Sequence, residues 1–359
     1  MTKKSVFGFF LIFLVNFEAD YGGTPNPSFL IYTYIYLHYF FTDMTLFQIL
    51  SKSINPESLL MGIATVLAGT AAAELHGNLE ILPAILCMLF AVFAQGASNL
   101  AHRYMDYRTN SGENIDDNIP RESDSGLSVG LILKEGYYSM MLLATMIGCA
   151  IATMTGWWAF VLGLIIFIIG WATNAGPMLV RTPWSLLSTF LLFGPIGVIG
   201  TSLVQSLHEA TDPLGWYDLS PAVFIGCVMG LMATNCHLVY NFATYRSDLR
   251  NSKRTFSIVF GRKAARILFI IIGLSAFFLM LTMCLTLKPE RWGLDMIAPS
   301  ISLIINVYIW WHMKSTSRHL AVQLIDLSIF KLVILSGLTL VFFLITGDPD
   351  DSNMTFFGF

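Results

Sequence analysis

Charged residues are scarce in this chain of 359 residues, where Asp, Glu, Lys and Arg together make up 12%. A soluble domain carries roughly twice that fraction, whereas 55% of the residues here are hydrophobic. This composition excludes an ordinary soluble domain and indicates a protein that lies in a lipid bilayer. The formal net charge of −3 carries little information, because membrane topology depends on where Lys and Arg lie. We expect no nucleic-acid partner.

Paired cysteines are also lacking, since no C-x-x-C spacing occurs in the sequence. Metal sites and disulfide frameworks usually show such spacing. The cysteines lie instead within apolar stretches, which favours buried packing thiols. They are Cys87, Cys149, Cys227, Cys236 and Cys284.

Long apolar runs are what the chain has in abundance. A helix needs about 20 mostly apolar residues to cross a bilayer, and nine segments approach or reach that length. Because the bilayer core offers no water to backbone groups, each segment is expected to be helical. The sequence therefore predicts an all-α fold, a polytopic membrane bundle of nine transmembrane helices. The segments are residues 58–73, 81–101, 138–154, 158–175, 184–203, 222–243, 265–287, 296–313 and 327–346.

Lys and Arg alternate between the loops that join these segments. The loop after the second segment has three arginines, and the loop after the sixth has six basic residues. The intervening loops are acidic or nearly neutral, apart from Lys288 and Arg291. Basic residues stay on the cytoplasmic side of a membrane. We therefore expect a multi-pass protein of a bacterial-type cytoplasmic (inner) membrane, with these two loops on the cytoplasmic side.

Residues 1–43 do not fit the bundle well, and we separate them as an N-terminal extension from a transmembrane domain at 44–359. Lys3 and Lys4 precede a short apolar run, residues 6–15, of the size of a signal-type h-region. Three interpretations stay open for this extension. It is an extra membrane-associated segment, a cleaved signal, or translated sequence upstream of a true start at Met44, and we favour the last slightly.

Two polar octets share the pattern N-x-x-x-x-x-x-D. The first runs from Asn99 to Asp106 at the end of the second segment, and the other from Asn241 to Asp248 at the end of the sixth. Residues at i, i+3, i+4 and i+7 lie on one face of a helix, so each Asn is predicted to project with its Asp. Polar residues are costly to keep at the mouths of membrane helices and indicate a functional site.

At these motifs the chain resembles the UbiA superfamily of intramembrane prenyltransferases, and within it the MenA branch that prenylates 1,4-dihydroxy-2-naphthoate. The second octet, continued by Ser252-Lys-Arg-Thr255, keeps the register of the family pattern N-N-x-R-D-x-x-x-D-x-x-x-G-K-R-T. The stretch from Gln95 to Tyr107 is similar to Q-x-x-x-N-x-x-N-D-Y-x-D-Y, and Gly176-Pro177 resembles a feature of the branch. The resemblance extends from about Pro56 to the C-terminus, and nine helices are the superfamily's architecture.

This resemblance implies that a polyprenyl group moves from its diphosphate to an aromatic acceptor, most closely 1,4-dihydroxy-2-naphthoate in menaquinone biosynthesis, with Mg²⁺ as cofactor. Mg²⁺ prefers oxygen ligands from one or two carboxylates plus substrate phosphates. By the family pattern Asp106 and Asp248 are the catalytic carboxylates that hold the metal, together with Asn99 and Asn241. The residues that would bind the diphosphate are Asn99, Arg103, Asn241, Lys253 and Arg254.

The chain departs from the family pattern in both motifs. His102-Arg103 stands where the pattern has Asn-Asp, and Thr244 stands at the leading aspartate of the second motif. Two accounts fit these changes. In one, the chain is a prenyltransferase whose Arg103 binds diphosphate oxygens directly, as a guanidinium does well. In the other, it is a non-catalytic relative of the fold that binds polyprenyl or quinone lipid. The surviving Asn, Asp and Lys253 positions favour the enzyme.

Simpler local interpretations exist for some of these residues. Asp106 and Arg103 are spaced i,i+3 and would also suit an ion pair at a helix end. Asp248, between Arg246 and Arg250, would suit a surface ion pair of little energetic weight. His237 lies inside the sixth segment, and we expect it to bond a neighbouring helix.

Overall fold

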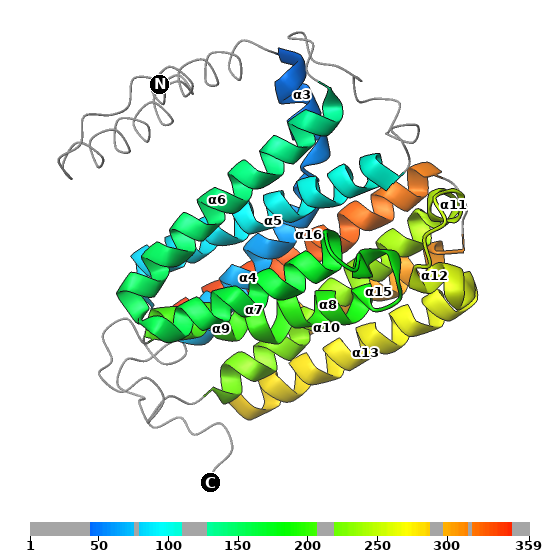
Figure 1. The fold of residues 1–359 in the computed structure, drawn as a ribbon. Coiled ribbons are helices and arrows are strands. Elements are labelled where there is room, and N and C mark those ends of the chain that lie inside the picture. Colours follow the sequence, from blue (N-terminus) through cyan, green and yellow to red (C-terminus); the bar gives the residue numbers. More distant parts are fainter. Residues whose placement is uncertain are drawn as a thin grey trace, which may run out of the picture. The chain divides into compact units, whose positions relative to one another are not determined.

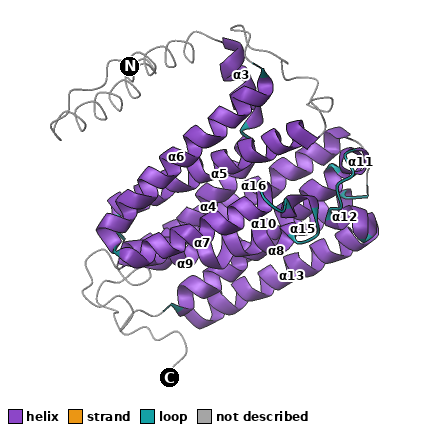
Figure 2. Cartoon of the chain, in the orientation of Figure 1, coloured by secondary structure: helices purple, strands orange, loops and turns teal. Residues whose placement is uncertain are grey.

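A computed structural model describes residues 44–74, 79–109, 128–206, 219–287, 297–314 and 318–346. Every element within these ranges is a helix (Figures 1 and 2). Each of the nine predicted apolar segments falls on a helix or on consecutive helices, so the all-α prediction is confirmed. Residues 1–43, and with them the predicted N-terminal extension, lie outside the described residues.

The first two described helices are interrupted just before Pro56. Proline suits the first turn of a helix but not its interior, so a new helix begins at this residue. These two are α3 (Met44–Ser53) and α4 (Pro56–Glu74). The others are α5 (Ile81–Thr109), α6 (Val129–Thr155), α7 (Trp157–Asn174), η1 (Leu179–Arg181), α8 (Ser185–Leu191), η2 (Leu192–Ile196), α9 (Gly197–Ser206), α10 (Ser220–Ala243), α11 (Tyr245–Arg250), α12 (Phe256–Val259), α13 (Gly261–Leu287), α15 (Ile297–His312) and α16 (Arg318–Thr346).

Six spans within the described residues are long and apolar enough to cross a membrane. Helices of this kind expose large apolar side chains, as at Ile81 and Trp157, which suits contact with lipid. The chain is therefore an integral membrane protein. Helices α4, α15 and α16 lie on the other three predicted spans, and the count of nine stays a prediction. The six spans are Ile81–Arg108, Val129–Thr155, Trp157–Asn174, Ser185–Ser206, Ser220–Ala243 and Gly261–Met283.

The chain divides into two compact units. One is formed by Met1–Lys52 and Asp116–Ile132, of which the structure describes most of α3 and the beginning of α6. The other is formed by Ser53–Ile115 and Leu133–Phe359, and it contains every motif residue named above. All that follows concerns this second unit.

Helix α10 is the centre of the second unit. It contacts α4, α8, η2, α9, α13 and α16, and most of its residues are buried. The largest apolar cluster is built around it from buried side chains of α4, α10, α13, α15 and α16. The motif at the end of α10 is thus attached to the best-packed helix of the unit.

The fifth predicted segment is divided where it crosses α10. Pro195 lacks a backbone N–H, and the chain forms a π-helical turn, η2, between α8 and α9. At this turn Gly194 lies directly against α10, where an added Cβ would be 2.6 Å from Gly226 O and 2.6 Å from Gly230 Cα. Glycine therefore permits the close approach of the two backbones.

A polar cluster lies inside the bundle, away from the two motifs. Lys331 of α16 is 1% exposed, and its Nζ donates to Asn306 Oδ1 of α15 at 2.6 Å. The amide nitrogens of Asn306 and Asn235 both face Gly273 of α13, where an added Cβ would lie 3.1 and 3.2 Å from them. Within the part of the chain that the structure describes, no carboxylate forms an ion pair with Lys331.

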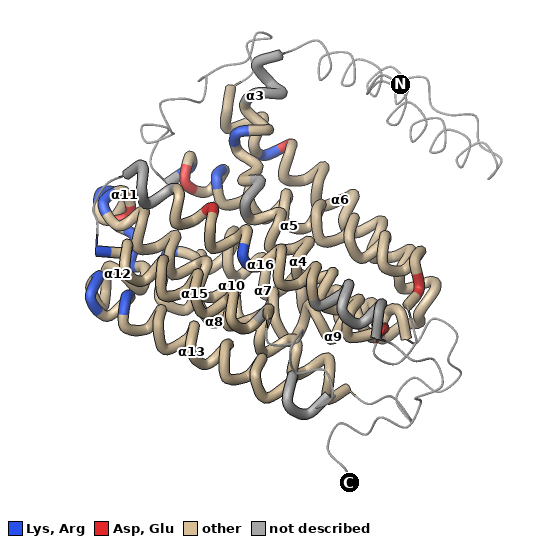
Figure 3. The backbone as a smooth tube through the Cα atoms, turned by 180° about the vertical axis from the view of Figure 1, so that it is seen from behind, with Lys and Arg blue, Asp and Glu red and all other residues tan. Residues whose placement is uncertain are grey.

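Charged side chains gather at one end of the second unit. Figure 3 shows basic residues together with acidic ones around α11 and α12, while most of the length of the long helices carries none. The second motif belongs to this charged end.

Candidate active site

Asp106, in the last turns of α5, is bound by two cations. Arg181 Nη2 lies 2.5 Å from Oδ1, and Lys253 Nζ lies 3.0 Å from Oδ2. His102, one turn earlier, places Nδ1 3.7 Å from Oδ2, too far for a hydrogen bond. Arg103, whose spacing would also suit an ion pair with Asp106, forms none with it in the described part of the chain. Partial burial of this cluster limits its screening by water.

A sharp turn after α7 delivers Arg181 to Asp106. At Gly176 an added Cβ would lie 2.7 Å from the tip of the Trp171 ring, so glycine lets the backbone pass close to this ring without displacing it. Met178 then adopts a left-handed conformation with φ of 55°, and the single turn of η1 ends at Arg181. Arg181 is a site residue that neither motif indicates in the sequence. The Gly176-Pro177 pair was the available signal, because it predicts a turn at the same membrane face as the motifs.

Lys253 reaches Asp106 because α11 ends in a Schellman motif. Ser252 has a positive φ of 51°, Lys253 N donates to Asp248 O at 2.9 Å, and Ser252 N donates to Leu249 O at 3.3 Å. The backbone of Lys253 is therefore fixed to Asp248, while its side chain is fixed to Asp106. One residue joins the two motifs.

Asp248 is 6% exposed and has no cation within ion-pair distance in the described part of the chain. Its Oδ2 accepts a hydrogen bond from Thr244 Oγ1 at 2.8 Å and a weaker one from Thr255 Oγ1 at 3.5 Å. Burial raises the pKa of Asp248, whereas these hydroxyls and the charge of Lys253 act in the opposite direction. A buried carboxylate that no cation neutralises is suited to bind one.

The two predicted asparagines lie in different surroundings. Asn241 is 2% exposed, and its Nδ2 has no hydrogen-bond partner among the described residues. Asn99 Nδ2 instead donates to Ser58 Oγ at 2.7 Å and to Asn55 O at 3.3 Å, which ties α5 to the start of α4. Asn241 is therefore available to a ligand, whereas Asn99 is occupied by the protein.

The second octet does not form one continuous helix, although the first lies wholly within α5. Helix α10 ends at Ala243 and α11 begins at Tyr245, with Thr244 between them. The prediction that Asn241 and Asp248 share the face of one helix was therefore wrong in its geometry. The break at Thr244 lets its hydroxyl reach the Asp248 carboxylate.

The other two predicted cations, Arg103 and Arg254, take part in none of the ion pairs among the described residues. Arg103 is partly buried, and the Arg254 side chain is exposed. The backbone N–H of Arg254 donates to Arg181 O at 2.7 Å, which ties the second motif to η1. Three separate stretches of chain are thereby held together at the end of the bundle.

A metal ion could not be held here by protein carboxylates alone. The described residues contain no group of three or more His, Cys, Asp or Glu that would hold a metal. Asp248 offers one carboxylate, and Asp106 offers a second only when Arg181 and Lys253 move away from it. That donor set fits an ion such as Mg²⁺, which takes the rest of its ligands from water and substrate phosphate.

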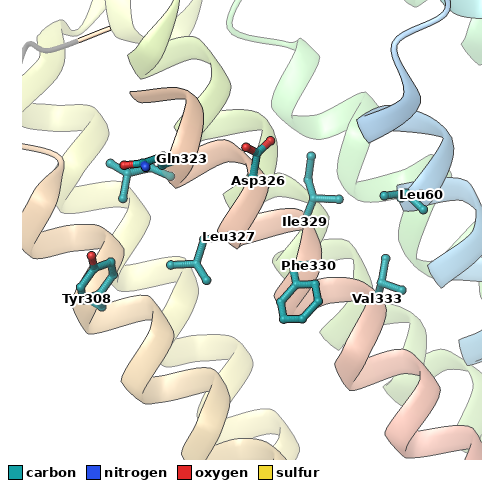
Figure 4. A pocket seen from close by; sticks show the side chains of 9 residues that line it. Leu60, Tyr308, Gln323, Asp326, Leu327, Ile329, Phe330 and Val333 are labelled. Atoms are coloured by element: carbon teal, nitrogen blue, oxygen red, sulfur yellow. The ribbon is translucent and has the colours of Figure 1, made fainter. Parts of the chain in front are cut away.

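An open groove of about 770 Å³ lies elsewhere, over α16 (Figure 4). Leu60, Tyr308 and Phe330 are among its lining residues, and Asp326 is the only charged one. None of the motif residues lines it, so the groove is separate from the site around Asp106.

His237 contacts a neighbouring helix, as the sequence analysis predicts. Its Nε2 lies 3.0 Å from Ser185 Oγ at the start of α8. One turn deeper, Thr234 Oγ1 approaches Leu186 O at 3.4 Å, so a second polar contact joins α10 to α8.

The sequence profile of the UbiA prenyltransferase family matches residues 62–335 of the chain. Proteins named 1,4-dihydroxy-2-naphthoate octaprenyltransferase are similar in sequence. The one from Bacillus subtilis is 25% identical over 232 residues, covering 61% of this chain and 68% of that protein. The one from Mycobacterium tuberculosis is 26% identical over 239 residues, covering 63% and 76%. The one from Escherichia coli is 25% identical over 229 residues, covering 60% and 69%.

Solved structures of similar fold are also known. A UbiA homolog from Aeropyrum pernix K1, in its apo form, has a TM-score of 0.58 at 14% identity, covering 81% of this chain and 98% of that one. A UbiA homolog from Archaeoglobus fulgidus bound to GPP and Mg²⁺ has a TM-score of 0.56 at 13% identity, covering 82% and 99%. At these identities the likeness shows the fold.

Proposed function

The chain belongs to the UbiA prenyltransferase family, and from this we propose that it transfers a polyprenyl group from its diphosphate to 1,4-dihydroxy-2-naphthoate in menaquinone biosynthesis. The names of the three bacterial relatives support this acceptor. Within the chain, the observation that most supports this proposal is the cluster in which Arg181 and Lys253 both bind Asp106.

Arg181 and Lys253 are placed to bind the diphosphate. A diphosphate carries more negative charge than one carboxylate, and cations bind phosphate oxygens through strong, charge-assisted hydrogen bonds. The planar guanidinium of Arg181 adds bidentate recognition, which an ammonium does not supply. We expect both cations to turn from Asp106 to the diphosphate when the substrate binds, with Arg103 and Arg254 adding positive charge nearby.

Asp248 and Asn241 are the residues we propose for Mg²⁺, with Asp106 joining them once its cations have turned to the substrate. The unneutralised, buried carboxylate of Asp248 is the observation that fits such an ion. When bound, Mg²⁺ would supply positive charge to the oxygens of the leaving diphosphate. The unpartnered Nδ2 of Asn241 would donate to a phosphate oxygen, leaving its Oδ1 for the metal.

Two properties of the chain would serve the chemical step. As the allylic C–O bond breaks, negative charge grows on the leaving diphosphate, and Arg181 and Lys253 would stabilise it. The allyl group becomes carbocation-like and reacts with water if water is present. The apolar helices around the inner side of the site would exclude that water until the electron-rich acceptor ring attacks. The ring carbon that forms the new C–C bond would lose its carboxylate as CO2, which restores the aromatic ring.

Localisation follows from the charge distribution. We propose that the protein lies in a bacterial-type cytoplasmic membrane with Asp106 and Asp248 at the cytoplasmic face, because the basic residues around α11 and α12 lie at that end of the second unit. A water-soluble, multiply charged diphosphate head group would then reach the site from the cytoplasm.

The direct test is turnover by the purified full-length protein in lipid nanodiscs. It would receive polyprenyl diphosphate, Mg²⁺ and 1,4-dihydroxy-2-naphthoate, and both pyrophosphate release and prenylated product would be measured. We expect Asp106→Ala and Asp248→Ala to abolish most of the rate. Asp326→Ala, which changes a carboxylate in the separate groove, is the matched control.

Pyrophosphate release no faster than that of the double Asp106→Ala, Asp248→Ala variant would refute catalysis and support the lipid-binding alternative. A variant with His102→Asn, Arg103→Asp and Thr244→Asp restores three residues of the family pattern. Activity that appears in this variant and is absent from the native chain would lead to the same conclusion.

A further inference from the structure

His237 is partly exposed within an otherwise buried stretch of α10. From Met232 to Val239 it is the one residue that is not buried. Its side chain is therefore not fully enclosed by protein, although the helix lies at the centre of the unit. A polar ring in that position inside a membrane protein is a candidate for binding a ligand.

The hydrogen-bonded pair of His237 and Ser185 lies on the inner side of the diphosphate site. His237 precedes Asn241 by four residues, about 6 Å along α10. Ser185 follows Arg181 by four residues and begins α8. The two helices thus place one polar group each just inside the residues proposed for the diphosphate, and these two groups contact each other at 3.0 Å.

The buried hydroxyl of Ser185 fixes which ring nitrogen of His237 carries the proton. Ser185 is 0% exposed, and among the described residues His237 Nε2 is the one partner of its Oγ. A buried hydroxyl proton needs an acceptor, so Ser185 donates to Nε2. The proton of the neutral ring then sits on Nδ1, which becomes an unbonded N–H donor.

We infer that this N–H of His237 binds the carboxylate of the aromatic acceptor, with Ser185 as a positioning residue that sets the tautomer. The inference rests on the proposed function. The allylic carbon is attached to the diphosphate, so an attacking ring must lie beside the diphosphate on the apolar side. That is where the pair lies. A neutral donor suits this apolar place, because burying it costs less than burying a cation, and its hydrogen bond to a carboxylate is charge-assisted.

Calorimetric binding provides a test that does not need turnover. The full chain in nanodiscs with Mg²⁺ would be titrated with 1,4-dihydroxy-2-naphthoate and, separately, with 1,4-dihydroxynaphthalene, which lacks the carboxylate. We expect His237→Leu to weaken the naphthoate roughly 10- to 100-fold, as for a lost hydrogen bond to a charged group. Its affinity for the carboxylate-free diol should change little.

Further variants separate recognition from folding. His237→Gln keeps a side-chain N–H donor and should recover most of the naphthoate affinity. Ser185→Ala should weaken the naphthoate by a smaller factor, because the tautomer is no longer fixed. The KM for polyprenyl diphosphate should stay near the native value in all three variants.

Equal weakening of both naphthalene ligands, or of neither, would overturn the inference, as would loss of naphthoate affinity in His237→Gln as large as in His237→Leu. The two proposals fail separately. Binding of the naphthoate that depends on His237, without pyrophosphate release, would refute the proposed function alone. Turnover with an acceptor KM that is unchanged in His237→Leu would refute this inference alone.

Discussion

Asp106 and Asp248 stand at equivalent positions in the two motifs but in opposite surroundings. Asp106 is neutralised by Arg181 and Lys253, whereas Asp248 is buried with hydroxyl partners and no ion pair among the described residues. The difference assigns separate tasks. In the proposed function, Asp106 would order the cations before the substrate arrives, and Asp248 would keep an unneutralised carboxylate for a metal ion.

Arg181→Ala is expected to raise the KM for polyprenyl diphosphate about 10- to 100-fold, because a charge-assisted contact with phosphate is lost. Steady-state kinetics with varied diphosphate would measure it. Arg250→Ala changes an exposed arginine on α11 and is the matched control. A KM in Arg181→Ala equal to that of the control would show that Arg181 serves only to hold Asp106.

The pH dependence of activity should respond to Thr244. Its hydroxyl stabilises the ionised form of Asp248, so Thr244→Val removes an influence that lowers the pKa of this carboxyl, and the pKa rises further. A protonated carboxyl cannot hold Mg²⁺. The acidic limb of the kcat/KM profile should therefore move to higher pH in Thr244→Val and stay in place in Thr244→Ser. A shift toward lower pH would contradict this assignment.

At the scale of elements, the end of α11 contains a residue ill suited to its conformation. Ser252 has a left-handed backbone at a position where the family pattern has glycine. Ser252→Gly should raise the free energy of unfolding by about 1 kcal/mol, since glycine adopts positive φ without the Cβ clash. Thermal unfolding in detergent would measure it. Ser252→Val should lower the midpoint, and a rise in that variant would argue against strain at this position.

Any side chain at Gly194 should weaken the packing of η2 against α10. An added Cβ would lie 2.6 Å from backbone atoms of α10, so Gly194→Ala should lower the free energy of unfolding by about 1–3 kcal/mol through overpacking. Gly163→Ala in α7 is the control, because nothing lies within 4 Å of its added Cβ. Equal unfolding midpoints for the two variants would mean that the helices separate easily.

The parts of the site that depend on the local order of residues were predictable from the sequence. The apolar runs predicted the helices, because membrane-spanning backbone has no alternative partner for its polar groups. The octets located Asp106 and Asp248, and the Lys253 side chain does lie at the site. Arg181 was missed because its role depends on a tertiary contact 75 residues away in sequence. The break at Thr244 was missed because helical spacing continues through it in the sequence.

At the scale of the whole molecule, Lys331 depends on a partner from another helix. Asn306→Leu leaves a buried ammonium without its partner and should lower the free energy of unfolding by about 3 kcal/mol. Lys331→Met removes the charge together with its burial cost, so a smaller loss is expected. Adding Lys331→Met to Asn306→Leu should restore stability, as measured by thermal unfolding in detergent. A larger loss from Lys331→Met than from Asn306→Leu would contradict this account.

The same bond between α15 and α16 has a consequence for biogenesis. A lysine at the middle of a helix costs about 2.5–3.5 kcal/mol when the translocon releases that helix into lipid, and α16 also carries Asp326. Asn306, on the preceding helix, offers Lys331 an acceptor, and the sequence predicts that both helices span the membrane. If both helices span the membrane as predicted, we expect α15 and α16 to leave the translocon together as a hairpin, so that α15 enters the lipid only after the ribosome has completed α16.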